Sequence, residues 1–335
     1  LLIVCGSATS WIINKVIKNH GGLHNRVSVR IHLKPFCLRE CELYSEEMGL
    51  RFNRRQVLEG YMIMGGVPFY WSQLKPGMSL AQNINQLFFS EDGSLRHEFD
   101  DLYDSLFKQP KPYLSIVDTL ATKKVGMTRT EILQATKLTD NGKLTEYLEN
   151  LEYCGFIRKY NCIGMKAKNA LFQLMDNYTL FYYKFIKDSY INDAQYWTKI
   201  TGKPEYNTWC GLAFERVCLQ HVEQIKTKLG IQGVITTVYS WSVAGSKDKP
   251  GAQIDLLIDR SDDVINLCEI KYSKAPFQIT NTIDASLQNK RERFIQETGT
   301  EKAVHLTMIT TMGLSDNPYA WDVQSVVTMD DLFVL

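Results

Sequence analysis

Two consecutive apolar segments, each carrying charged residues, constrain the fold more than any other part of the sequence. Residues 251–259 read Gly-Ala-Gln-Ile-Asp-Leu-Leu-Ile-Asp, and residues 268–271 read Cys-Glu-Ile-Lys. Short runs rich in Ile and Leu predict two largely buried strands. Because alternate residues of a strand point to the same face, we expect Glu269 and Lys271 side by side, with Asp255 on the neighbouring strand.

This arrangement is a candidate site for metal-assisted phosphodiester hydrolysis. We expect Asp255 and Glu269 to ligate Mg²⁺ or Mn²⁺, with the backbone carbonyl of Ile270 as a candidate third ligand. Lys271 would orient the attacking water or stabilise the phosphate in the transition state. A strand with Glu-x-Lys can instead form an exposed ion pair. The aliphatic neighbours of Asp255 favour the metal site, because a carboxylate in a buried strand needs a partner.

Further polar residues could complete the site. Glu215 lies in a predicted helix before these strands and would act through water or a second metal ion. Gln253 and Gln288 either support the site or hydrogen-bond the backbone. The pattern predicts an αβββαβ domain over 207–335, with helices at 212–229 and 283–297 and strands at 234–241, 252–260, 264–272 and 302–310.

Upstream, the pattern predicts several smaller units. Residues 1–50 alternate strand (1–5), helix (11–19) and strand (27–33), and residues 51–112 are helical with a break at Gly65-Gly66-Val67-Pro68. Residues 113–176 predict three helices and a β-hairpin, the outline of a winged helix that binds DNA or protein; Thr128 and Glu131 predict a capping box there. An aromatic helix follows within 177–206, and its rings are expected to fill a core or an interface.

Composition limits the partners. The chain has 335 residues with 38 Lys and Arg against 37 Asp and Glu, so DNA binding requires local basic patches. No segment is long and apolar enough to predict a membrane span. Eight scattered cysteines without metal-ligand spacing predict reduced thiols in a cytoplasmic protein. The chain starts at Leu1, inside a predicted strand, which suggests the C-terminal portion of a longer protein.

The order helix-Glu, strand-Asp, strand-Glu-x-Lys resembles the PD-(D/E)xK nuclease superfamily. The whole chain resembles prokaryotic AAA-type ATPases that carry a winged helix and a C-terminal restriction-endonuclease-like domain. The motifs that carry this resemblance are Leu2-Ile3-Val4-Cys5-Gly6-Ser7, Asn25-Arg26, Ile31-x-Leu33-x-Pro35-Phe36 with Glu40, Tyr61 with Gly65-Gly66-Val67-Pro68-x-Tyr70, Asp176-x-Tyr178, Gly211-x-x-Phe214-Glu215, Gln253-Ile254-Asp255, Glu269-Ile270-Lys271 and Thr307-x-x-Thr310-Thr311-x-Gly313-Leu314.

The resemblance implies a multidomain α/β and α protein. It would comprise a remnant of a P-loop ATPase core (1–50), a helical lid (51–112), a winged helix (113–176), an aromatic helix and linker (177–206) and a nuclease-like domain (207–335). Ser7 would take the place of the polar sensor at the γ-phosphate, and Arg26 that of an arginine that contacts nucleotide phosphate. The chain contains no G-x-x-x-x-G-K-[ST] loop, so we expect ATP to bind only in a longer parent protein.

Two functions are compatible with these observations. In the first, the parent is an ATP-dependent DNA-processing enzyme whose C-terminal domain cuts DNA with Mg²⁺ or Mn²⁺. In the second, the ATPase is a nucleotide-dependent regulatory switch whose nuclease-like domain only binds DNA or protein. A homo-oligomer and a protein partner of the winged helix are further expectations.

Overall fold

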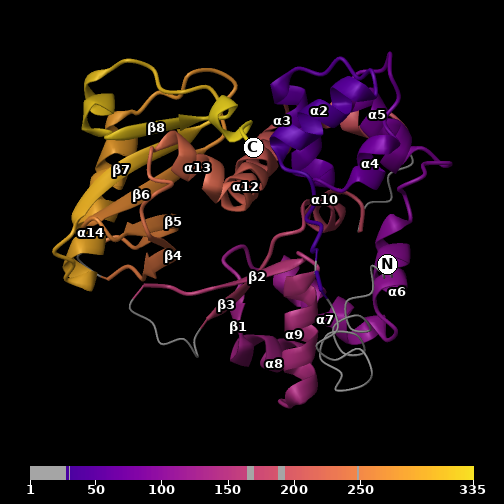
Figure 1. Cartoon of the computed structure of the whole chain (residues 1–335), viewed down its shortest axis with the longest axis horizontal. Coiled ribbons are helices and arrows are strands. Elements are labelled where there is room, and N and C mark those ends of the chain that lie inside the picture. Colours follow the sequence, from indigo (N-terminus) through magenta and orange to yellow (C-terminus); the bar gives the residue numbers. More distant parts are fainter. Residues whose placement is uncertain (1–27, 30, 164–169, 188–192, 247–248) are drawn as a thin grey trace. The chain divides into compact units, whose positions relative to one another are not determined.

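The computed structural model describes residues 28–29, 31–163, 170–187, 193–246 and 249–335, which form a mixed α/β protein with two sheets (Figure 1). The expected strand 1–5 and helix 11–19, together with Ser7 and Arg26, lie outside these residues. The chain divides into two compact units. Unit 1 comprises Leu1–Pro35, Ala81–Lys159 and Leu171–Thr198, and unit 2 comprises Phe36–Leu80, Tyr160–Ala170 and Lys199–Leu335.

Unit 1 contains the elements predicted for residues 113–176. Helices α7, α8 and α9 are followed by strands β2 and β3, and the capping box forms because Thr128 and Glu131 bond each other's backbone N–H groups. A two-residue strand β1, which was not predicted, pairs with β3. The bounds are α7 Pro110–Ala121, β1 Met127–Thr128, α8 Arg129–Thr136, α9 Gly142–Tyr153, β2 Ile157–Tyr160 and β3 Leu171–Leu174.

Aromatic side chains form the core beside these elements. Phe181 and Phe185 of the aromatic helix α10 are buried, and Phe181 makes edge contacts with Phe88 and Trp197. The expectation that these rings fill a core is therefore confirmed for these residues. The surrounding helices are α5 Leu80–Ile84, a π-helical turn η2 Asn85–Phe89, α6 Glu98–Leu106, α10 Asn177–Phe185 and α11 Tyr196–Ile200.

The strand expected at 27–33 is wrong for the residues described. Residues 28, 29 and 31–33 have no regular secondary structure, and Val29, Ile31 and Leu33 are 73%, 78% and 83% exposed. The alternating pattern suits a strand, but no neighbouring strand pairs with these residues in the part of the chain that the structure describes.

Unit 2 is built around a five-stranded sheet in the order β4-β5-β6-β7-β8. The β4–β5 and β5–β6 pairs are antiparallel, and the β6–β7 and β7–β8 pairs are parallel. The predicted αβββαβ order is observed, and β8 is an addition that was not predicted. The bounds are α12 Pro204–Gln220, α13 Val222–Lys228, β4 Thr236–Val243, β5 Ala252–Arg260, β6 Val264–Lys271, α14 Asn281–Thr298, β7 Ala303–Thr310, η4 Pro318–Asp322, β8 Ser325–Thr328 and η5 Asp330–Leu332.

Helices cover both faces of this sheet. Leu287 and Phe294 of α14 join the core formed on one face by Leu257, Leu267 and Met308. The single helix expected at 212–229 is two helices: α12 begins with Pro204 in its first turn, where proline is favoured, and ends before His221. Helix α12 packs against β6 and also against α3.

Three helices from the first quarter of the chain belong to the same unit, namely α2 Leu38–Glu47, α3 Arg54–Met64 and α4 Pro68–Ser72. The predicted break between α3 and α4 is explained by a close backbone approach. The N–H of Phe36 donates to the Gly66 carbonyl at 2.8 Å, and a Cβ on Gly66 would lie 1.9 Å from the Phe36 carbonyl oxygen. Only glycine fits this position.

His221 joins these early helices to the sheet domain. Its Nε2 accepts the N–H of Leu38 in the first turn of α2 at 3.0 Å, and its Nδ1 donates to the Val217 carbonyl at 2.8 Å. The ring is 1% exposed and lies edge-on to Tyr61. Burial lowers the pKa of His221 from 6.5 to about 4, so the ring is neutral at pH 7 and carries its proton on Nδ1.

We expect this contact to make unit 2 sensitive to acid. The unfolded chain binds the proton with a pKa near 6.5, whereas folded His221 resists it down to about 4, so the stabilisation is complete above pH 6.5 and is lost as the pH falls towards 4. The loss amounts to about 3 kcal/mol. Urea unfolding between pH 7.5 and 4 measures it. His221→Gln should be less stable at pH 7 but show a flatter pH profile, and parallel profiles would contradict this assignment.

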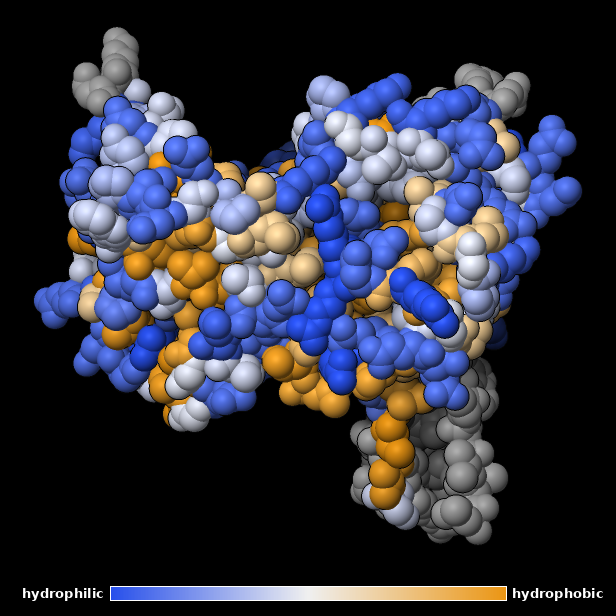
Figure 2. Space-filling view, turned by 90° about the horizontal axis from the view of Figure 1, so that it is seen from above, coloured by the Kyte–Doolittle hydropathy of each residue, from blue (hydrophilic) through white to orange (hydrophobic). Residues whose placement is uncertain are grey.

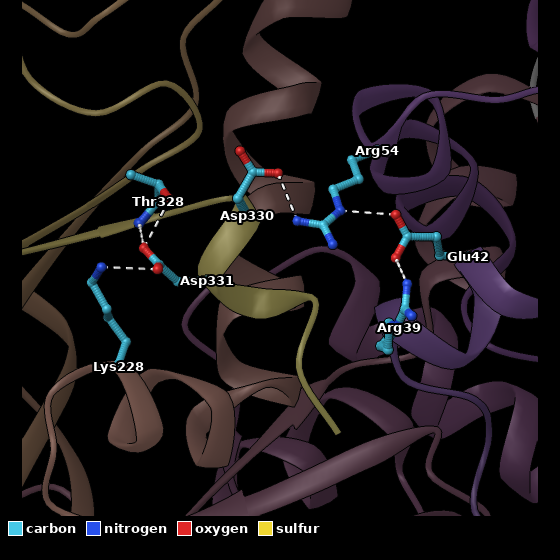
Figure 3. Close-up of polar contacts among 7 residues, drawn as sticks. All are labelled: Arg39, Glu42, Arg54, Lys228, Thr328, Asp330 and Asp331. Carbon is cyan, nitrogen blue, oxygen red and sulfur yellow. Dashed lines mark hydrogen bonds and ion pairs between the residues drawn. The ribbon is translucent and has the colours of Figure 1, made fainter.

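A chain of polar contacts links α2 and α3 to the C-terminal segment (Figure 3). The Arg54 guanidinium donates from Nε to Glu42 at 2.8 Å and from a terminal nitrogen to Asp330 at 3.2 Å, and it lies 5.0 Å from the Phe333 ring. Glu42 also bonds Arg39. The neighbouring Asp331 accepts from Lys228 Nζ at 2.9 Å and from the backbone N–H and the hydroxyl of Thr328. The hydrogen bonds from Arg54 and Arg39 lower the pKa of the Glu42 carboxyl.

Substitutions in this network should differ in their effect on stability. Arg54→Ala removes contacts with three groups and should lower the free energy of unfolding by about 1–2 kcal/mol. Asp330→Ala should cost less than about 0.5 kcal/mol, because Asp330 is 63% exposed in its pair with Arg54. Urea unfolding at pH 7 checks both values; equal effects would contradict the assignment of Arg54 as the centre of the network.

Hydrophilic and hydrophobic residues are interspersed on the molecular face shown in Figure 2. Among the described residues, no helix is long and apolar enough to cross a bilayer. The seven cysteines in the described part of the chain are not joined by disulfides.

Candidate functional site

The sheet of unit 2 forks between β5 and β6. The paired residues of these strands end at Leu256 and Cys268, whereas β5 continues its pairing with β4 as far as Ala252 and β6 continues with β7 as far as Lys271. The two strands therefore separate beyond this point. Asp255 is the first residue past the last pair on one branch of the fork and Glu269 is the first on the other, which puts both sequence-predicted carboxylates at the same opening.

A β-bulge lies at the start of the fork. Tyr239 pairs with Leu257 and Trp241 pairs with Ile254, so β5 has one residue more than β4 between these pairs. Ile254 and Leu257 both belong to the core that also contains Leu287 and Phe294 of α14, so Asp255 and Leu256 are the two bulge residues between these core positions. A bulge increases the local twist and redirects a side chain, and such features recur beside active sites.

Glu269 lies between two lysine ammonium groups. Its Oε1 is 2.7 Å from Lys271 Nζ and its Oε2 is 2.6 Å from Lys290 Nζ. The Glu269 side chain is 11% exposed, against 39% for Lys271 and 18% for Lys290. The i and i+2 spacing predicted that Glu269 and Lys271 share a face, and the ion pair between them is the alternative to a metal site that the sequence left open. The position of Lys290, on α14, shows that Glu269 faces that helix.

Asp255 belongs to a second group of polar residues. Its Oδ1 accepts from Gln253 Nε2 at 2.7 Å, as the candidate supporting role of Gln253 requires. Burial lowers the pKa of the Arg216 guanidinium on α12, and the charges of Glu215 and Asp255 oppose this shift. Glu215, the acid predicted from the helix, therefore acts electrostatically on the same arginine as Asp255.

The structure thus distributes the four predicted catalytic residues over two groups at the fork. Glu269 and Lys271 form one with Lys290, and the charges of Glu215 and Asp255 both act on Arg216. Within the described ranges, no group of three or more His, Cys, Asp or Glu side chains could hold a metal ion. The two carboxylates, one on each branch of the fork, are oxygen donors of the kind that a hard divalent cation takes, and water or backbone oxygens would have to supply the rest of its shell.

Sequence reasoning missed Lys290 and misjudged Gln288. Gln288 donates to Asp322 at 2.8 Å and to Asp284 at 3.2 Å, so it tethers the loop before β8 and does not contact the carboxylate pair at the fork. Lys290 lies in a helix whose sequence, Gln288-Asn289-Lys290-Arg291-Glu292-Arg293, reads as an ordinary exposed face. The spacing along the helix could have indicated this position. Lys290 lies three residues after the buried Leu287, and residues three apart are neighbours on the same side of a helix.

Neutralising Glu269 should destabilise unit 2. Glu269→Gln leaves Lys290 facing an amide in a largely buried place, and the expected loss is about 3 kcal/mol in the free energy of unfolding. Asp259→Asn is the matched control, because Asp259 pairs with Lys302 at 2.7 Å at the other end of β5, where both side chains are about a third exposed; its loss should stay below about 1 kcal/mol. Urea unfolding in EDTA measures both, and equal losses would contradict the special position of Glu269.

Comparisons with known proteins do not assign a family. No protein-family model matches the sequence. The uncharacterized protein MJECL04 of Methanocaldococcus jannaschii is 25% identical over 228 residues, which cover 67% of this chain and 50% of that protein. The chain therefore corresponds to about half the length of this relative. Protein VC1899 of Vibrio cholerae aligns with 89% of this chain and 59% of its own at 12% identity, with a TM-score of 0.25, too low to support a shared fold.

Proposed function

We propose that unit 2 contains a PD-(D/E)xK-type nuclease site that cleaves DNA with Mg²⁺ or Mn²⁺. The observation that carries the proposal is the fork, where Asp255 and Glu269 occupy the first positions past the last β5–β6 pair and Lys271 bonds Glu269 at 2.7 Å. Strand separation at this point leaves an edge of the sheet where a phosphodiester can approach carboxylates held by a rigid core. The order of helix, strands and acids agrees with this assignment.

The chain's residues have separable tasks in this proposal. Asp255 and Glu269 would hold the divalent cation, which supplies a polarised water and neutralises charge on the phosphate. Lys271 is the more exposed partner of Glu269, so its ammonium can turn to a phosphate oxygen. The water oxygen loses a proton and forms a bond to phosphorus, as the bond from phosphorus to the leaving deoxyribose oxygen breaks and the leaving oxygen takes up a proton. Gln253 fixes the orientation of the Asp255 carboxylate.

One observation favours the alternative, a domain that binds DNA or protein without cutting it. Both oxygens of Glu269 bond ammonium groups, so the carboxylate is neutralised by the chain itself. A site of this kind can present Lys271 and Lys290 to a phosphate without a metal ion. Binding of DNA in EDTA at an affinity equal to that in Mg²⁺, without cleavage in either, would support this alternative.

We further propose that the chain is the C-terminal part of an AAA-type ATPase that acts in DNA processing. The support is the motif resemblance, together with a relative twice the length of the matched segment. In that setting the helices and small sheet of unit 1 would bind DNA or a protein partner, possibilities that follow from the winged-helix outline. Nucleotide binding by the longer protein, abolished by substitution of Ser7 and Arg26, is the corresponding test.

Nuclease assays on the 335-residue chain test the central proposal. With Mg²⁺ or Mn²⁺ and linear, nicked and single-stranded DNA, Asp255→Ala and Glu269→Ala should each lower the cleavage rate at least about 1,000-fold, and EDTA should abolish cleavage. Lys271→Ala should lower it by about 100-fold or more. Asp259→Ala, in the same strand but away from the fork, is the control that should cleave normally. Unchanged cleavage in both carboxylate variants would refute the assignment.

A further inference from the structure

The second ammonium on Glu269 belongs to no part of the sequence motif. Lys290 reaches Glu269 Oε2 at 2.6 Å from α14, an element separated from β6 by the loop 272–280. With Lys271 on Oε1, both carboxylate oxygens are occupied. A cation that ligates Glu269 must therefore compete with at least one ammonium.

The two lysines are not equivalent in this competition. Lys271 is the last residue of β6 and its side chain is 39% exposed, so it can leave Glu269 for solvent or phosphate. Lys290 is 18% exposed, and α14 packs on the sheet through Leu287 and Phe294, which are buried in the core. Arg293 of the same helix also bonds the Pro250 carbonyl at 3.2 Å, close to the start of β5. Lys290 is therefore the ammonium that the fold holds in place.

The net charge of Glu269 and its two lysine partners affects the binding of a cation. Glu269 with Lys271 and Lys290 carries a net charge of +1, counting one carboxylate and two ammonium groups. A divalent cation that approaches such a group is repelled by the fixed ammonium, and the repulsion is strong where the side chains are shielded from water. Removal of Lys290 frees one oxygen of Glu269 and removes one positive charge.

We propose that Lys290 is a positioning residue that acts as an internal counter-ion: it holds Glu269 in the cation-free protein and sets how tightly the fork binds a divalent cation. This inference rests on the proposed function, since it concerns the same carboxylate. It predicts two effects of opposite sign when Lys290 is replaced. The protein without metal becomes less stable, and its affinity for Mn²⁺ rises.

The experiment measures Mn²⁺ binding to the full 335-residue chain by the electron paramagnetic resonance signal of free Mn²⁺, with urea unfolding in EDTA alongside. Lys290→Met should bind Mn²⁺ about tenfold more tightly than the parent chain and unfold at lower urea. Lys302→Met is the matched control, because Lys302 bonds Asp259 at 2.7 Å at the opposite end of the same sheet. This control should leave the affinity for Mn²⁺ unchanged. Lys290→Arg retains the charge and should resemble the parent chain.

The outcomes separate the two claims. Mn²⁺ binding by the parent chain with equal or weaker binding by Lys290→Met would overturn the role of Lys290 and leave the proposed nuclease site standing. Mn²⁺ binding by Lys290→Met but not by the parent chain supports the role of Lys290. The proposed function then depends on a site that binds Mn²⁺ more weakly in the parent chain than in this variant. Absence of Mn²⁺ binding by the parent chain and by every variant would overturn both.

Discussion

The separation of β5 from β6 is the constraint on which the candidate site depends. The bulge opposite Ser240 gives β5 one residue more than β4, and beyond Leu256 the strand stays paired with β4 and leaves β6. Without this divergence Asp255 would face Glu269 across a closed ladder. The fork replaces ladder hydrogen bonds with an open edge, and each of α12 and α14 carries a cationic residue that interacts with one of its two carboxylates.

The charges at the fork are balanced by the chain itself. Two ammonium groups hold Glu269, and a buried guanidinium, Arg216, lies within electrostatic reach of Asp255 and Glu215. A buried charge without a partner is costly, so these interactions let the fold keep its charged groups without a bound ion. The same balance makes cation binding an exchange of partners, and the exposed lysine at the end of β6 is the partner that can leave most easily.

Much of this arrangement could be predicted from local sequence, and the rest depends on distant contacts. The strand at 252–260 was predicted with its observed bounds, because a short run of Ile and Leu has few conformations other than a buried strand open to it. The common face of Glu269 and Lys271 followed from strand periodicity. Lys290 could not be found in this way, since its partner lies 21 residues away on another element. The break at His221 was missed for the same reason: the ring bonds Leu38, 183 residues earlier in the chain.

Asp255 and Glu269 are proposed to share one divalent cation at the fork. Crystals of the 335-residue chain soaked in Mn²⁺ and measured near the manganese absorption edge test it most directly. We expect an anomalous difference peak within about 2.5 Å of a carboxylate oxygen of each residue, with one lysine displaced from Glu269. A map in which Glu269 keeps both Lys271 and Lys290 and no peak lies at the fork would contradict it.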